Sequence, residues 1–169
     1  QVNVVMPNYG ILHEVDKAEF IQSVTVMFAG ESQEVSFYKY TVENSDKNVT
    51  QWIAHHPLFS SCGVGSVYCD DPNNRPFATD ATKFALFNAA VGQAIIDHVF
   101  GHVDVLHLHD WHTAVLSVLR SYDPQYEALK LIRTTYTIHN LALQGIRPLS
   151  GDESSLETWF PDLNYDVNV

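Results

Sequence analysis

The sequence predicts an α/β fold built on a mostly parallel sheet, with helices on both faces and an antiparallel β-hairpin as an insertion. Two β-branched, apolar runs at 103–108 and 132–138 flank a helical segment at 112–121. This is the pattern of two parallel strands joined by a helical crossover. Segments 20–29 and 34–42 alternate polar and apolar residues on either side of a turn-prone Gly-Glu-Ser, which is typical of a hairpin.

The remaining elements extend this pattern over the whole chain. In order they are strands at 2–6 and 49–54, a long helix at about 80–100 and a short helix at 152–160. Thr79 or Asp80 can cap the long helix, because short polar side chains accept hydrogen bonds from free N–H groups at a helix start. Its apolar residues recur every three or four positions and form one packing stripe. The sequence contains no internal repeats and no linker-like segments, so we expect one domain.

Composition and charge exclude several classes of function. The 169 residues carry 9 Lys and Arg against 20 Asp and Glu, a formal net charge of -11. Such a field repels polyanions, so we expect no nucleic-acid partner and no anionic membrane surface. No apolar run approaches the roughly 20 residues needed to cross a bilayer. If the ligand carries phosphates, most of the cations that hold them should come from elsewhere.

The chain ends and the two cysteines suggest where the protein works. The sequence opens inside an apparent strand without an initiator methionine or a secretory signal, and it stops at an apolar alternation, YDVNV. We therefore expect part of a longer polypeptide, located in the cytoplasm. Cys62 and Cys69 match no zinc or redox spacing, so two reduced thiols are the expectation.

A polar cluster, HLHDWH, follows the first strand of the crossover pair. His107, His109, Asp110 and His112 could hold zinc or iron, although Trp111 interrupts the usual metallo-hydrolase spacing. By itself His107 is most simply a core histidine that bonds to backbone. A carboxylate beside an indole face is, in contrast, a common way to hold a sugar.

A second cluster, TIHNLALQG, follows the other strand. His139 ends the strand, Asn140 tolerates turn geometry, and Gln144 with Gly145 offers an amide and a close backbone approach. Ligands of parallel sheets bind beyond the carboxyl ends of the strands, so both clusters fall where a site is expected. One such cluster is a common polar turn, but two on the same edge favour a site.

These motifs resemble a known family. DVLHLHDWHTAVL and RTTYTIHNLALQG are similar to the corresponding segments of bacterial glycogen synthases and plant starch synthases, and AHHPLF and DATKFALFNAAV also look like segments of that family. The resemblance covers most of the chain and is closest over 104–145. It implies a GT-B glycosyltransferase, in which two Rossmann-like halves face across a cleft. Residues 1–169 then form part of the N-terminal, acceptor-side half.

The resemblance also implies roles for individual residues. His139 would contact the donor glucose near the bond being broken, and Asp110 would lie beside the sugar and the acceptor; both are expected to be catalytic. Trp111 and Gln144 carry over more weakly. The full set of expected substrate-binding residues is Trp111, His109, His112, Asn140, Gln144 and Gly145.

The implied reaction is retaining transfer of glucose from ADP-glucose or UDP-glucose to the 4-hydroxyl of an α-1,4-glucan, without a metal or other cofactor. The family's first strand with its Lys-x-Gly-Gly-Leu loop, and the nucleotide-binding C-terminal half, are absent from this sequence, and Leu143 replaces the usual Tyr. We therefore expect little transferase activity from the chain alone. Two alternatives stay open: a stand-alone carbohydrate-binding module and a metal-dependent hydrolase that uses His107, His109, Asp110 and His112.

Overall fold

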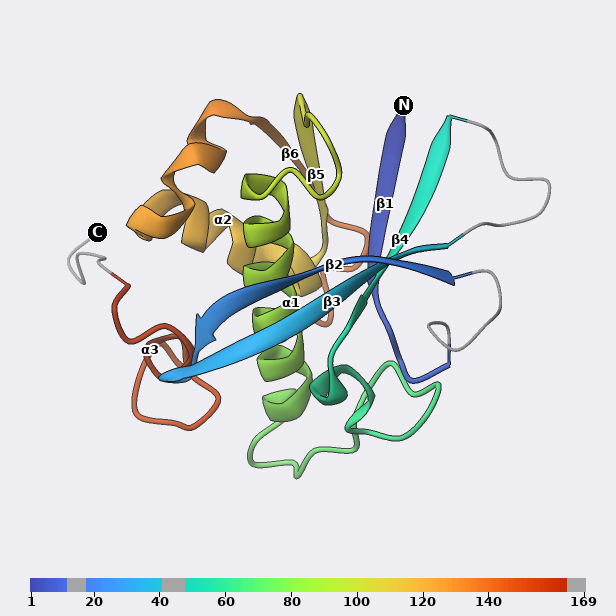
Figure 1. The fold of residues 1–169 in the computed structure, drawn as a ribbon. Helices are drawn as coiled ribbons and strands as arrows, with labels where there is room; N and C mark the ends of the chain where they lie inside the picture. The colour runs from blue at the N-terminus through green and yellow to red at the C-terminus, as the bar shows by residue number, and fades with distance from the viewer. Residues whose placement is uncertain (12–17, 41–47, 164–169) are drawn as a thin grey trace.

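A computed structural model describes residues 1–11, 18–40 and 48–163. The terminal YDVNV segment and positions 41–42 of the expected hairpin lie outside the described residues. The described strands form two sheets, one of four strands and one of two, and Figure 1 shows both together with the long helix α1. The α/β class predicted from the sequence is confirmed.

The larger sheet has the strand order β1-β4-β3-β2. Its strands are β1 (Val2–Pro7), β2 (Ala18–Phe28), β3 (Glu31–Tyr40) and β4 (Val49–His55). β2 and β3 pair antiparallel through the turn at Ala29 and Gly30, as the hairpin pattern predicts, and β1 pairs parallel with β4. The inner face of the hairpin packs into the core through the buried side chains of Val24, Val26, Val35 and Phe37.

The smaller sheet consists of β5 (Val105–His109) and β6 (Arg133–Thr137), which pair parallel. The crossover between them holds the 3-10 turn η2 (Trp111–Thr113), helix α2 (Ala114–Tyr122) and the 3-10 segment η3 (Pro124–Leu131). This confirms the predicted strand–helix–strand unit. It also places the ends of both strands, and hence both polar clusters, at one edge.

Helix α1 (Ala78–Ile96) is the centre of the core. The sequence predicts one apolar stripe, but the helix is buried on nearly every side, because β2 and β4 pack on it from one direction and α2 and η3 from another. In Figure 1, β2 and β3 cross over this helix. The predicted cap at Thr79 or Asp80 is wrong: Phe77, with φ 61°, precedes the helix, and Asp80 is buried inside its first turn.

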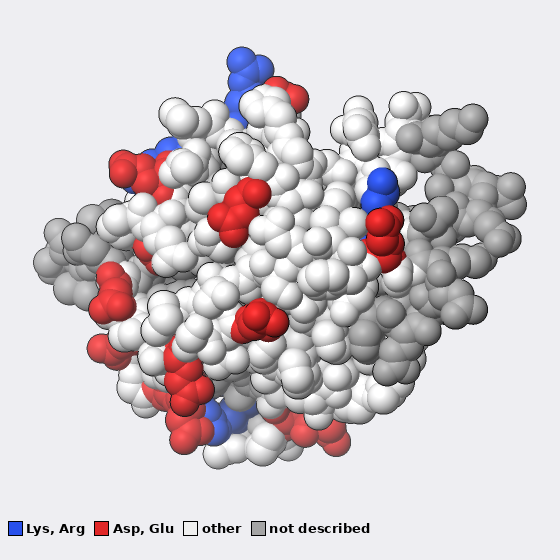
Figure 2. Space-filling view, in the orientation of Figure 1, with Lys and Arg blue, Asp and Glu red and all other residues white. Residues whose placement is uncertain are grey.

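Two short elements complete the described chain. They are the 3-10 turn η1 (Pro57–Ser60) and helix α3 (Leu156–Trp159), which lies within the predicted range of 152–160 but begins only after Ser155. No helix in the described ranges is long and apolar enough to cross a membrane. Acidic side chains outnumber basic ones on the face shown in Figure 2, in keeping with the net charge of -11.

Candidate functional site

The carboxyl ends of β5 and β6 present different side chains on their two faces. In the parallel register, His107 lies opposite Thr135 and His109 opposite Thr137. Side chains alternate between the faces of a strand, so His139 continues the face of Thr137, whereas Tyr136, Ile138 and Asn140 belong to the other face. The site therefore has two parts, one on each side of the β6 backbone.

The first part is the histidine row, formed by His107, His109 and His139. The His107 and His109 ring centroids lie 4.1 Å apart, and the His109 and His139 rings stack at 5.2 Å. His109 Nδ1 is 3.0 Å from His139 Nε2, and His107 Nε2 is 2.7 Å from Thr137 Oγ1. All three side chains are exposed, so the expectation that His107 is a core histidine is wrong. Its partner is a hydroxyl on the neighbouring strand rather than buried backbone.

The second part is the β6 pocket, a cavity of about 290 Å³ on the opposite face. Its lining consists of Asp110, Trp111, Ala114, Tyr136, Ile138, Asn140, Leu141, Leu143 and Gln144. An apolar wall with a few convergent polar groups is the usual composition of a small-molecule site. Three of the expected substrate-binding residues, Trp111, Asn140 and Gln144, line this pocket together with Asp110.

The apolar part of this lining is not predicted by the two polar clusters. The strand pattern accounts for Tyr136 and Ile138 only as strand residues, and Leu141 falls in the loop that follows. Their signal is the period of two that ends at Asn140, which puts Tyr136, Ile138 and Asn140 on one face. Tyr136 and Ile138 are 42% and 56% exposed, so this face has no covering layer among the described residues.

Asp110 joins the two parts of the site. Its Oδ1 accepts hydrogen bonds from the backbone N–H groups of His139, at 2.6 Å, and Asn140, at 3.2 Å. These bonds, that from His139 foremost, hold the pKa of the carboxyl below its usual value despite an opposing effect of burial. Asp110 also has φ 55°, an unusual backbone conformation for a residue other than glycine. The carboxylate is therefore ionised and fixes the start of the loop after β6.

The His139 imidazole and the Asp110 carboxylate do not lie in one cavity. The His139 ring packs against His109, whereas Asp110 lines the β6 pocket. The His139 backbone is nevertheless in direct contact with Asp110, so the two predicted catalytic residues are neighbours across the strand edge. Their catalytic role stays a prediction at this point.

Gly145 is required where it lies. With φ +57° it adopts a left-handed conformation, and a Cβ placed on it would overlap the indole of Trp111. The indole is held from its other sides by edge-on contacts with Phe77 and Phe84, at centroid distances of 5.6 and 5.3 Å. The role of Gly145 is thus to let the loop close over Trp111, which forms a wall of the β6 pocket.

His112 is not among the residues that line the β6 pocket. Its Nε2 lies 2.9 Å from the hydroxyl oxygen of Tyr68, its ring packs on Phe84, and burial lowers its pKa. Asn88, buried in α1, donates to the His112 carbonyl and accepts from the Leu116 N–H, so it fastens the start of α2. Direct contact of His112 with a substrate stays a prediction.

A family model described as the starch synthase catalytic domain matches residues 1–169. The chain belongs to this family. The glycogen synthase of Hydrogenobaculum sp. (strain Y04AAS1) is 30% identical over 146 residues, which is 86% of this chain and 28% of that protein. The glycogen synthase of Bacillus anthracis is 47% identical over 73 residues, 41% of this chain and 14% of that protein.

A solved structure shows the same fold. The catalytic domain of starch synthase IV from Arabidopsis thaliana, bound to ADP and acarbose, matches with a TM-score of 0.61 and 22% identity. The match covers 85% of this chain and 27% of the other. The chain therefore spans little more than a quarter of the length of the Hydrogenobaculum and Arabidopsis proteins, each of which it matches over most of its own length.

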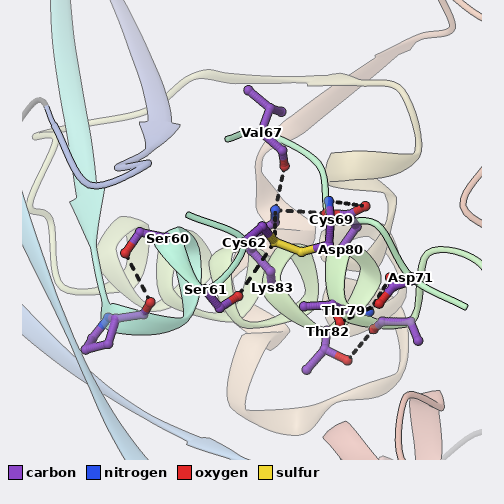
Figure 3. Close-up of a disulfide and its surroundings, with 12 residues drawn as sticks. Ser60, Ser61, Cys62, Val67, Cys69, Asp71, Thr79, Asp80, Thr82 and Lys83 are labelled. Atoms are coloured by element: carbon purple, nitrogen blue, oxygen red, sulfur yellow. Dashed lines mark hydrogen bonds and ion pairs between the residues drawn. A yellow bond between two sulfur atoms is a disulfide. The ribbon is translucent and has the colours of Figure 1, made fainter. Parts of the chain in front are cut away.

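The cysteines of this family member form a disulfide, Cys62–Cys69, contrary to the expectation of two reduced thiols. The loop from η1 folds back over the first turns of α1, and this brings together two cysteines whose spacing in the sequence predicts no pairing. Figure 3 shows Lys83 beside the disulfide; its Nζ contacts Asp80 Oδ1 at 2.9 Å and donates to the Val67 carbonyl. The Cys69 N–H donates to the same Asp80 carboxylate.

The geometry does not support the metal-hydrolase alternative. Within the described ranges, the ligand atoms of His107, His109, Asp110 and His112 do not gather, whereas Cys62, Cys69 and Asp80 place theirs within 4.8 Å of one another. The two sulfurs of that group are bonded to each other and so are not thiolate ligands. The HLHDWH cluster divides instead between the histidine row and the β6 pocket.

Proposed function

We propose that the chain is the acceptor-side part of a retaining glucosyltransferase of the glycogen and starch synthase type. The enzyme would transfer glucose from ADP-glucose or UDP-glucose to the 4-hydroxyl of a growing α-1,4-glucan. Membership of the starch synthase family supports the reaction class. The single observation that carries the assignment to this site is the β6 pocket, where Asp110, Asn140 and Gln144 converge beside the indole of Trp111.

In this proposal the β6 pocket takes a glucose unit of the glucan acceptor. The apolar lining suits the face of a pyranose ring, while the carboxylate of Asp110 and the amides of Asn140 and Gln144 suit its hydroxyls. The histidine row, on the other side of the β6 backbone, would face the donor glucose. The His139–Asp110 hydrogen bond then keeps the two sugar positions in a fixed relation.

The proposed reaction breaks the bond between the anomeric carbon and the leaving phosphate oxygen, and forms a bond from that carbon to the acceptor O4. The O4 proton passes to the leaving diphosphate, which departs as ADP or UDP. Positive charge develops on the sugar and negative charge on the diphosphate, so positioning and electrostatic stabilisation supply the catalysis. This scheme requires no metal or other cofactor.

The leaving diphosphate also needs cations, and we infer that they come from the nucleotide-binding half of the enzyme. Three basic side chains of the described residues are already engaged: Lys83 pairs with Asp80, and Arg75 and Arg147 both pair with Asp152. The net charge of -11 supports the same inference. We expect the 169-residue chain alone to transfer no measurable glucose.

A carbohydrate-binding module without turnover is the second candidate, because an apolar wall with the polar groups of Asp110, Asn140 and Gln144 suits a sugar whether or not transfer follows. The deciding experiment measures transfer of labelled glucose from ADP-glucose and UDP-glucose to glycogen by the complete polypeptide. We expect activity that falls at least a hundredfold in Asp110→Asn and His139→Ala, with Lys130→Ala, on the exposed connector, as the unaffected control. Tight glucan binding without any transfer would instead support the module.

A cytoplasmic location stays a prediction. Disulfides persist mainly in oxidising compartments, so Cys62–Cys69 does not support it. Alkylation of the protein in freshly lysed cells, followed by mass measurement, would report whether the two thiols are reduced where the protein resides.

A further inference from the structure

We propose that His109 is a positioning residue that acts through His139, fixing the orientation and the proton position of its imidazole. This inference deepens the proposed function, because His139 is the residue expected to face the donor glucose. Sequence analysis assigned His109 to substrate binding. The contacts of its ring point instead to a role in support of the neighbouring histidine.

The first observation is the direct contact between the two rings. His109 Nδ1 and His139 Nε2 are 3.0 Å apart, a hydrogen-bond distance, and the rings are stacked with 16° between their planes. A hydrogen bond between two neutral imidazoles uses one proton, so one nitrogen donates and the other accepts. The tautomer of His139 is therefore tied to that of His109.

The chemistry of imidazole indicates which nitrogen donates. Neutral histidine in water prefers to carry its proton on Nε2. His139 Nε2–H donating to His109 Nδ1 lets both rings keep that preferred form. The opposite arrangement would force both rings into the less favoured one. The structure thus assigns the lone pair of His139 to Nδ1, where it can accept a hydrogen bond from a sugar hydroxyl.

The second observation is that His109 itself is held firmly. The Thr113 hydroxyl accepts from the His109 N–H at 2.7 Å and donates to the His109 carbonyl at 2.9 Å. The His109 ring is flanked by His107 and His139, and His107 is in turn bonded to Thr137 Oγ1. A side chain anchored through its own peptide and by a neighbouring ring on either side can transmit its geometry to His139.

The third observation is that the two anchors of His139 come from consecutive residues. His109 holds the imidazole, and Asp110 holds the backbone N–H. Burial, His107 and His139 lower the pKa of His109, in that order, against an opposing effect of Asp110. These are the titratable groups that face His109. They keep it neutral near pH 7, the form in which Nδ1 can accept.

The test is a long-range ¹H–¹⁵N correlation spectrum of the histidine rings in the 169-residue chain at pH 7.5. In the unmodified chain we expect His139 in a single neutral tautomer with its proton on Nε2. His109→Ala should give averaged ¹⁵N shifts for His139, typical of a free imidazole. His102→Ala is the matched control, because that histidine is exposed and pairs with Asp104; it should leave the His139 signals unchanged.

Two amide variants separate positioning from simple packing. In His109→Asn the amide replaces the imidazole near the position of Nδ1, so it can still accept from His139 and should restore the single tautomer. In His109→Gln the amide falls near the position of Nε2 and should not. If His109→Ala loses its dispersed amide spectrum, the comparison of the Asn and Gln variants decides alone.

An unchanged His139 tautomer in both His109→Ala and His109→Gln would overturn the inference. So would a His139 proton on Nδ1 in the unmodified chain. Neither result depends on glucosyl transfer, so failure of this inference is distinct from failure of the proposed function.

Discussion

Removal of the Cys62–Cys69 disulfide should destabilise the protein by an amount that the loop length sets. The two cysteines are seven positions apart, so the closed ring holds eight residues. Loop-closure entropy for a ring of this size corresponds to about 2.5 kcal/mol at 25 °C. For a chain of this length, that loss lowers Tm by about 5–10 °C.

The assay is urea unfolding of the unmodified chain and of the double variant Cys62→Ser, Cys69→Ser, each with and without dithiothreitol. We expect the reductant to lower the unfolding free energy of the unmodified chain to that of the double variant, and to leave the double variant unchanged. Equal stability of all four samples, within about 0.5 kcal/mol, would refute the reasoning, because the unfolded chain should gain conformational entropy when the ring of eight residues is no longer closed.

The same perturbation should reach the candidate site. Tyr68 precedes Cys69, and its hydroxyl is hydrogen-bonded to His112, next to the pocket residue Trp111. Opening the ring frees Tyr68, so the ring signals of His112 should shift on reduction. Those of His102, remote on the surface, should stay in place.

Three further results follow from the loop after β6 and from the Asp152 contacts. Gly145→Ala should destabilise the chain by about 2–4 kcal/mol in urea unfolding, from left-handed strain and overlap with Trp111; Gly151→Ala, with φ +76° but open space, should cost less than half as much. Because the pKa of Asp110 is lowered, its hydrogen bond with the His139 N–H is complete above about pH 4 and is lost as the pH falls through the folded-state pKa. The chemical shift of the His139 amide proton should therefore change with a midpoint below pH 3.8, and a midpoint above that value would contradict the role of Asp110 as an anchor. Asp152→Asn should lower Tm, because hydrogen bonds from Arg75, Ser154 and Arg147 hold the pKa of Asp152 far below its usual value; an unchanged Tm would show that these contacts are not stabilising.

The parts of the fold that depend on local pattern could be predicted from the sequence. The period of two in β2 and β3 specified the hairpin, and the two apolar runs around α2 specified the parallel pair β5–β6. Burial of α1 on nearly every side could not be predicted from its own periodicity, because it depends on which elements pack against both of its sides.

In the candidate site, too, local pattern predicted some features, and others depend on how distant segments pack. The position of Asp110 at a strand end predicted its place at the sheet edge. The separation of His139 from the β6 pocket follows from which face each residue takes, and so requires the pairing register of β5 and β6. The Tyr68–His112 hydrogen bond and the Cys62–Cys69 pairing join segments that no local pattern connects. Only the path of the loop between η1 and α1 brings them together.

The most direct test of the account is a titration of the 169-residue chain with maltoheptaose, followed by ¹H–¹⁵N spectra. A glucose unit seated in the β6 pocket should shift the indole N–H of Trp111, the side-chain amide of Gln144 and the backbone amides around Ile138. The variant Asp110→Asn should weaken those shifts. Shifts confined to a second pocket, around Gly30 and Glu157, or no shifts at millimolar glucan, would contradict the assignment of the β6 pocket to a sugar.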